Sequence, residues 1–210
     1  LSLAAILLTH HHADHQGGVG DLLAVHRAEV FGPATEPIAH ISQPLADGET
    51  VRVIPCEIEF QVIAVPGHTR GHIAYYGAGC VFCGDTLFAG GCGRLFEGTA
   101  AQMAASLARL ASRPAETRVY CAHEYTEANL RFALAVEPGN AQLRKRIAEA
   151  AATRANGLPT VPSTIALKQA TNPFLRCDQS EVIAAAQSRQ ENARNPVEVF
   201  AALREWKNRF

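Results

Sequence analysis

The sequence predicts a mixed α/β domain followed by a smaller helical domain, and three observations lead to this prediction. An apolar run at residues 3–9 ends in a polar loop, which is typical of a strand buried on both faces. Polar and apolar residues alternate over residues 57–65 with the period of two of a half-buried strand. After about Tyr125 the periodic segments are all helical. We therefore divide the chain into domains at residues 1–124 and 125–210.

The remaining elements of the first domain follow from shorter patterns. Apolar runs predict strands at residues 73–76, 80–83 and 118–121, and the run at 80–83 indicates a buried strand. Between them, residues 100–111 place apolar side chains at helical spacing, and this segment ends before Pro114. The first domain is thus expected to combine several strands with few helices.

The second domain is expected to contain helices and no further strands. Asn140 is placed to cap a helix that runs to about residue 155. Another helical stretch covers residues 180–190. Pro196 favours the start of a last helix that reaches about residue 208, because proline is preferred in the first helical turn.

Composition excludes several classes of protein. The chain has 210 residues, is 48% hydrophobic, and carries 19 basic and 20 acidic residues, for a formal net charge of −1. With no run of Lys or Arg, it lacks the basic surface that nucleic acids and anionic membranes require. No apolar run near its start approaches the roughly 20 residues that span a bilayer. We expect a monomer that acts on a small molecule, with no nucleic acid or membrane partner.

The six cysteines are too scattered for a disulfide framework in a chain of this length. Cys80 and Cys83 have the C-x-x-C spacing of redox and metal sites, but they fall in an apolar strand and are expected to be inert core thiols. We therefore expect a protein of the reducing cytoplasm.

A dense group of histidines follows the first strand. Residues 9–15 read THHHADH, so that four of the nine histidines and one Asp fall within six residues. His68, Asp85 and His123 each follow a later strand. Because loops at one edge of a sheet converge, these side chains are expected to complete one site. Imidazole and carboxylate ligands suit Zn, Fe or Mn.

The motifs THHHADH, PGHTRGH, CGDTLF and AHEYT, in this order, resemble those of the metallo-β-lactamase-fold hydrolases. TNPFLR and the terminal REWK narrow the resemblance to glyoxalase II, the hydroxyacylglutathione hydrolases. The match covers about residues 3–207. It implies an α+β fold, the αββα sandwich of that superfamily with its N-terminal part missing, followed by a small helical glutathione-binding domain.

The resemblance also implies a site for two divalent metal ions, zinc first, with iron or manganese open. Asp14 and Asp85 are the implied catalytic carboxylates, and Asp85 bridges the metals. His11 is the variable position between ligands, and His72 is expected to support the site. The implied ligands are His10, His12 and His68 for one metal, Asp14, His15 and His123 for the other, and Asp85 for both.

Two metal ions that share a water make hydroxide available at neutral pH, so a thioester can be hydrolysed without a Ser or Cys nucleophile. In glyoxalase II the substrate is S-D-lactoylglutathione. Arg204 and Lys207 share a face of the last helix and are expected to hold its glycine carboxylate. The family often has Tyr where Phe96 stands, so weaker binding is expected. The implied substrate-binding residues are Arg94, Phe96, Tyr125, Asn129, Arg204 and Lys207.

Two alternatives remain. One is a persulfide dioxygenase of the same superfamily, which uses a single iron and lacks a comparable helical tail. The other is an inactive metal-binding fragment, because Leu1 stands almost at the strand that carries the first metal loop. On this ground we expect the chain, expressed as it stands, to be poorly soluble, metal-poor and nearly inactive, and upstream residues to restore these properties.

Overall fold

Two packed β-sheets form the centre of the protein in a computed structural model that describes residues 2–210. The strands are β1 (Ala5–Leu7), β2 (Glu29–Pro33), β3 (Gln43–Leu45), β4 (Thr50–Val53), β5 (Ile58–Ala64), β6 (Ile73–Gly77), β7 (Cys80–Gly84), β8 (Leu87–Phe88), β9 (Gly91–Cys92), β10 (Arg118–Cys121) and β11 (Ser163–Thr164). The larger sheet has the order β11-β10-β7-β6-β5-β4. The smaller sheet, β1-β2-β3, is parallel, and β8 and β9 form a separate hairpin.

The helices lie mostly in the second half of the chain. They are α1 (Ala13–Gln16), α2 (Val19–Val25), α3 (Ala100–Ala111), α4 (Thr126–Val136), α5 (Ala141–Ala155), α6 (Ile165–Thr171), α7 (Ser180–Gln187) and α8 (Pro196–Arg209), with short 3-10 turns at Ile54–Cys56 and Pro173–Leu175. None of the helices within residues 2–210 is long and apolar enough to cross a membrane.

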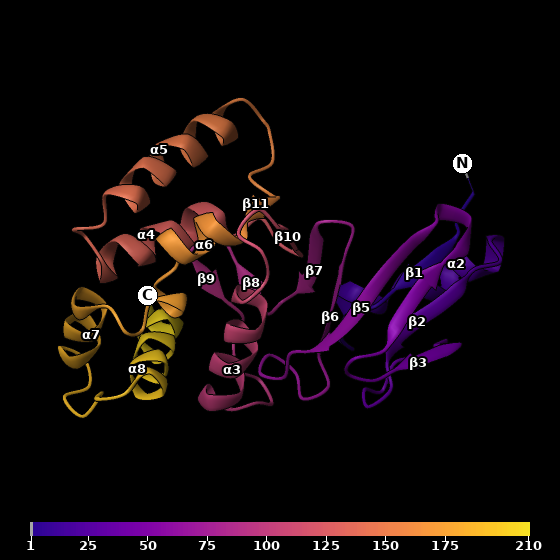
Figure 1. The fold of residues 1–210 in the computed structure, drawn as a ribbon, viewed down its shortest axis with the longest axis horizontal. Helices are drawn as coiled ribbons and strands as arrows, with labels where there is room; N and C mark the ends of the chain where they lie inside the picture. Colours follow the sequence, from indigo (N-terminus) through magenta and orange to yellow (C-terminus); the bar gives the residue numbers. More distant parts are fainter. Residues whose placement is uncertain (1) are drawn as a thin grey trace.

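Period-two alternation in the strands builds the layers. In β1, Leu7 packs between the two sheets, whereas Ile6 points outward to a cluster that includes Val19 of α2. In β5, Val62 faces the small sheet and Ile63 faces the layer of α3 and the C-terminal helices. The predicted αββα sandwich is therefore present, with the helical layers outside and the sheets inside (Figure 1).

The C-terminal helices share one apolar core with the large sheet. Phe132 of α4 and Phe200 and Leu203 of α8 belong to the same buried cluster as Ile63 of β5 and Leu107 of α3. The division after residue 124 stays a prediction, but the helical segment does not pack separately. Helices α4 to α8 lie together on one side of the large sheet, opposite β1 to β3 (Figure 1).

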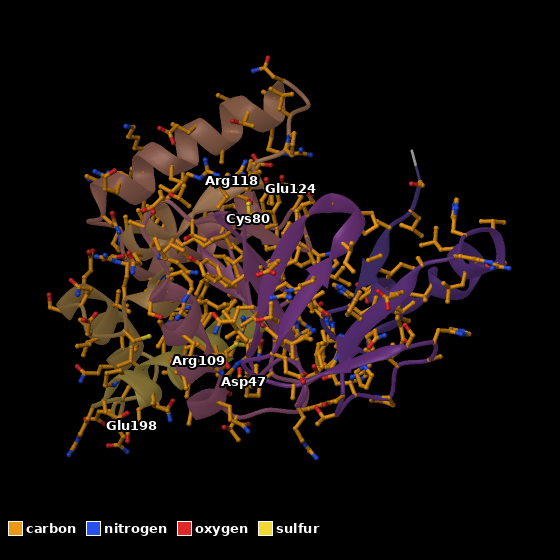
Figure 2. The ribbon with its side chains drawn as sticks, turned by 45° about the vertical axis from the view of Figure 1, so that its right-hand side comes forward. Asp47, Cys80, Arg109, Arg118, Glu124 and Glu198 are labelled. Atoms are coloured by element: carbon orange, nitrogen blue, oxygen red, sulfur yellow. The ribbon has the colours of Figure 1, made fainter. Side chains whose placement is uncertain are left out.

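Helix α3 is capped at its N-terminus and bonded to the large sheet near its C-terminus. Thr99 caps its N-terminus, and a reciprocal bond from Gln102 completes a capping box. Near its C-terminus, Arg109 donates to both oxygens of Asp47, at 2.9 and 3.1 Å, and to the carbonyl of Ala64. Figure 2 shows the side chains of Asp47 and Arg109 next to one another.

Several predicted elements have the expected bounds, and others differ. The predicted segments 100–111 and 118–121 coincide with α3 and β10, and the helix capped by Asn140 is α5. The prediction of no strand after residue 125 is wrong, because β11 pairs with β10. Residues 13–16, expected in a loop, form α1. Phe82 was expected to be buried, but it is 39% exposed and stacks on Tyr120.

The TNPFLR motif holds the β8–β9 hairpin in place. The Asn172 side chain is buried and donates to the carbonyls of Gly91, at 2.9 Å, and Phe88, at 3.3 Å, while its own carbonyl accepts from the Phe174 backbone N–H. Asn172→Ala leaves buried carbonyls without donors, so we expect the free energy of unfolding to fall by about 1–3 kcal/mol in chemical denaturation. Asn156→Ala, at an exposed helix end, is the control and is expected to change it by less than about 0.5 kcal/mol.

Candidate metal and substrate site

The first histidine loop follows β1 and is tied to both sheets. The backbone of Leu8 donates to Phe31 of β2, and Ile73 of β6 donates to Thr9 at 2.9 Å. The buried hydroxyl of Tyr75 donates to the Leu8 carbonyl at 2.7 Å. These bonds fix the loop at one edge of the sandwich, next to the loop between β5 and β6.

Three histidine nitrogens converge in a first group. Nδ1 of His12 lies 3.1 Å from Nε2 of His10 and 3.0 Å from Nε2 of His68. His68 donates from Nδ1 to the Arg94 carbonyl at 2.9 Å, which leaves its Nε2 free as a ligand. Ligands about 2.0–2.1 Å from a tetrahedral zinc stand roughly 3.3 Å apart, close to these separations. The group therefore has the spacing of a metal site.

A second group lies beside the first, and Asp85 joins them. Oδ2 of Asp14 lies 3.5 Å from Nε2 of His15 and 3.4 Å from Nε2 of His123. Oδ1 of Asp85 is 3.4 Å from these same two histidine nitrogens, and its Oδ2 is 3.4 Å from Nε2 of His68. One carboxylate thus presents one oxygen to each group, which is the arrangement of a bridging ligand.

Hydrogen bonding and charge fit two cations at this place. Nε2 of His15 and Oδ1 of Asp85 are buried without a hydrogen-bond partner within residues 2–210. Burial lowers the pKa of His10 and His68 and keeps them neutral. Burial raises the pKa of Asp85, but the nearby His15, His68 and His123 outweigh it and hold this pKa low. The neutral His10 and His68 and the ionised Asp85 are in the forms that bind metals, and the close grouping of the side chains is suited to a dinuclear site.

His72 lies beneath the ligands and supports them. It is fully buried, stacks on His10 with ring centroids 4.6 Å apart, and accepts the Asp85 backbone N–H at Nε2. Burial lowers its pKa to about 3, so it is neutral. Gly84, at φ +48°, permits this packing, because a Cβ there would lie 2.5 Å from Oγ1 of Thr9.

A cavity of about 380 Å³ opens from the metal groups toward helix α8. Its volume is in the range of small-molecule sites. It brings all six predicted substrate-binding residues together, although their roles stay predictions. The lining residues are His68, Asp85, Phe88, Cys92, Gly93, Arg94, Phe96, Tyr125, Asn129, Arg204 and Lys207.

The wall of the cavity that α8 supplies is cationic. Burial lowers the pKa of Lys207 to about 8, and the charge of Arg204 contributes. Arg204 is only 4% exposed and donates from Nη1 to the Cys92 carbonyl at 2.9 Å, so part of its guanidinium holds the β8–β9 hairpin. Its Nε and the Nδ2 of Asn129 are buried without partners within residues 2–210. These free donors and charges suit an anionic ligand.

Sequence reasoning missed two residues near this site. Phe88 lines the cavity and lies 5.4 Å from the Tyr125 ring between centroids, and its place in the CGDTLF motif was the available signal. Glu36 bonds to both histidine loops, and nothing in the pattern around it distinguishes it from other polar residues.

Two family models together match the whole chain. The model described as "Metallo-beta-lactamase superfamily" matches residues 1–123. The model described as "Hydroxyacylglutathione hydrolase C-terminus" matches residues 124–210. The second match favours the hydrolase over a persulfide dioxygenase, for which no comparable helical tail was expected.

Curated relatives and solved structures agree with these models. The hydroxyacylglutathione hydrolase of Dechloromonas aromatica is 53% identical, with 100% of this chain and 84% of the relative covered. The hydroxyacylglutathione hydrolase of Pseudomonas aeruginosa strain PAO1 is 56% identical, with 99% of this chain and 81% of the relative covered. The crystal structure of ETHE1 from Myxococcus xanthus gives a TM-score of 0.64 at 28% identity, covering 99% and 77%. The crystal structure of TTHA1623 in a di-iron-bound form gives a TM-score of 0.56 at 30% identity, with 83% of this chain and 79% of that chain covered. Matched by both family models and by these curated relatives, the chain belongs to the hydroxyacylglutathione hydrolase (glyoxalase II) family of the metallo-β-lactamase superfamily.

Proposed function

We propose that this hydrolase cleaves the thioester of S-D-lactoylglutathione to D-lactate and glutathione, with two zinc ions held by the seven ligands. The observation that carries the proposal is one cavity that is lined both by Asp85 and His68 of the metal groups and by Arg204 and Lys207 of α8. A small acyl group at the metal end and an anionic peptide at the cationic end match this distribution of charge.

Two divalent ions held by these ligands would make hydroxide available at neutral pH and would polarise the thioester carbonyl. Hydroxide adds to the acyl carbon, the bond between carbon and sulfur breaks, and the glutathione thiolate leaves with the bonding electron pair. The thiol of a cysteine has a pKa near 8.5, so the thiolate is a good leaving group without covalent catalysis by the protein.

The residues of this chain position the metals and the substrate. His68 keeps its Nε2 toward the first group because its Nδ1 is occupied by the Arg94 carbonyl. Tyr125 stacks on His123, with ring centroids 4.9 Å apart, and forms a wall beside the second group. Nδ2 of Asn129, which has no partner within residues 2–210, and the Lys207 ammonium are donors for the amides and carboxylate of glutathione.

A single preparation of a protein that contains residues 1–210 tests the proposal. We expect elemental analysis to find close to two zinc ions per chain, and loss of thioester absorbance to report turnover of S-D-lactoylglutathione. Oxygen consumption with glutathione persulfide and one iron per chain would instead identify the dioxygenase. Bound metal without turnover of either substrate would indicate an inactive metal-binding fragment.

Substrate affinity is expected to depend on pH through Lys207. Its pKa of about 8 means that the ammonium is charged below this pH and neutral above it. The attraction for the substrate carboxylate is therefore present below pH 8 and lost above it. We expect KM to rise as the pH passes through 8, measured by initial rates from pH 6.5 to 9.5. This rise should be absent in Lys207→Met, and its persistence there would exclude Lys207 as the cause.

The cellular compartment is also part of the proposal. Within residues 2–210 all six cysteines are free, and four of them are buried. Burial raises the pKa of Cys83 and Cys177 to about 12, so these thiols are unreactive. Unpaired cysteines and a glutathione substrate both suit the reducing cytoplasm.

A further inference from the structure

Glu36 occupies a turn beside the metal loops, although it is not a ligand of the two groups described above. The turn follows β2, and the Glu36 backbone donates to the Pro33 carbonyl. Because β1 and β2 are parallel, with Leu7 opposite Phe31, their ends lie at the same edge of the sheet. This places Glu36 next to the first histidine loop, with a side chain that is only 2% exposed.

The carboxylate of Glu36 joins the two loops that supply the first metal group. Oε2 accepts from the backbone of His11 at 2.6 Å and from its Nδ1 at 2.8 Å. Oε1 accepts from the Thr69 hydroxyl and from the Gly71 backbone at 2.9 Å. Each oxygen thus receives two donors from one loop, and His11 and Thr69 are the chain neighbours of ligands.

Two further features show that this contact is tightly fitted. A Cβ at Gly71 would lie 2.5 Å from Cγ of Glu36, so only glycine permits the approach. On the outer side, Oε1 of Glu97 lies 3.3 Å from Nε2 of His11, and its Oε2 accepts from the Arg70 backbone at 2.9 Å. Glu97, which is more exposed, therefore ties the same two loops a second time.

We infer that Glu36 is a positioning residue that sets the separation of His10 and His12 from His68. It thereby sets the affinity of this first group for its metal ion. His11, Glu36 and Glu97 are close enough to hold a cation themselves. However, both Glu36 oxygens are already occupied by two donors each, so the carboxylate serves as a clamp. The inference rests on the dinuclear site of the proposed function.

The Glu36 carboxylate cannot be replaced by an amide, because both of its ends must accept hydrogen bonds. All four groups that face Glu36 donate, and only a carboxylate has acceptors at both ends. In Glu36→Gln one end carries an NH₂ group, which opposes either the two His11 donors or the Gly71 N–H. One of the two loops is therefore released while the side chain keeps its size.

The test uses the full chain with Glu36→Gln and measures zinc dissociation constants by competition with a coloured chelator. Loss of groups that orient ligands typically costs about 10- to 100-fold in metal affinity, and we expect a loss of this size for one of the two zinc ions. The Co(II)-substituted protein should show a changed visible absorption spectrum. For S-D-lactoylglutathione kcat should fall and KM should stay nearly constant, because Glu36 does not line the cavity.

Two further variants keep the inference falsifiable. Thr69→Val removes one donor without changing size or charge, and should weaken zinc by about 2- to 10-fold. Glu49→Gln, the same change at an exposed carboxylate that accepts one backbone N–H, should bind zinc like the unaltered chain.

Unchanged zinc constants and an unchanged Co(II) spectrum in Glu36→Gln would overturn the inference. The inference would also be overturned if Glu36→Gln proved unfolded in the absence of metal while Thr69→Val bound zinc with the affinity of the unaltered chain. Fewer than two zinc ions in the unaltered chain is a different result, because it overturns the proposed metal site together with the inference.

Discussion

Asp85→Ala is expected to lose bound metal and to lower thioester turnover by more than about 100-fold, since changes in residues that merely orient ligands already cost 10- to 100-fold. Asp85 presents Oδ1 to His15 and His123 and Oδ2 to His68, all at 3.4 Å. Without this anion, two cations in adjacent groups repel one another with no charge between them. Metal content by elemental analysis and initial rates on S-D-lactoylglutathione measure the two losses.

Matched variants distinguish the bridging role of Asp85 from the effect of removing any carboxylate from the chain. Asp85→Asn keeps the shape of the side chain and one oxygen but removes the charge, so it should retain more metal than Asp85→Ala and still turn over slowly. Asp21→Ala, at an exposed carboxylate of α2, should keep the metal and activity of the unaltered chain. Full metal retention in Asp85→Ala would contradict the bridging role.

The candidate site was predictable because its ligands follow strands with clear patterns. The apolar run before residue 9 and the alternation before His68 both indicated strands, and loops after neighbouring strands meet at one edge. The strand at 118–121 placed His123 in the same way. The division of ligands between two metals came from the family resemblance, because spacing alone does not show which nitrogen faces which ion.

The segment from α2 to β3 was not predicted, for physical reasons. Strands β2 and β3 are short and contain Gly32, Pro33 and Pro44, which weaken or remove strand signals. In the sheet β2 pairs in parallel with β1, and β3 pairs in parallel with β2, and these are contacts between distant residues that a local pattern does not encode. Glu36 was missed for the same reason, since its four donors lie 25 to 35 positions along the chain.

Helical spacing likewise showed which face Arg204 and Lys207 share, but not how deeply each is buried. Both line the cavity, as their spacing suggested. Arg204 is 4% exposed and bonds to the Cys92 carbonyl, whereas Lys207 is half-buried with its ammonium 5.0 Å from the centre of the Phe132 ring. The depth depends on how α8 packs, which a periodic pattern does not encode. As a result, the two cations are expected to respond differently to substitution.

Lys207→Met is expected to raise KM for S-D-lactoylglutathione and leave kcat nearly unchanged. Methionine keeps the apolar stem but removes the charge, and a charge-assisted contact is worth roughly 1.5–3 kcal/mol, or about 10- to 150-fold in kcat/KM. Lys207 is proposed to contact the glutathione part and not the reacting acyl group, so the lost contact stabilises the ground state and the transition state alike. Steady-state kinetics over a range of substrate concentrations measures the split.

Arg204→Ala should raise KM as well, but it should also lower kcat and the free energy of unfolding. Its guanidinium holds the Cys92 carbonyl of the β8–β9 hairpin. The next residues, Gly93 and Arg94, line the cavity, and the Arg94 carbonyl anchors His68. A less tightly held hairpin is therefore expected to displace His68 of the first metal group. Lys145→Met, at an exposed lysine of α5, is the control for charge loss. Equal KM values in Lys207→Met, Arg204→Ala and the unaltered chain would contradict the proposal that helix α8 binds glutathione.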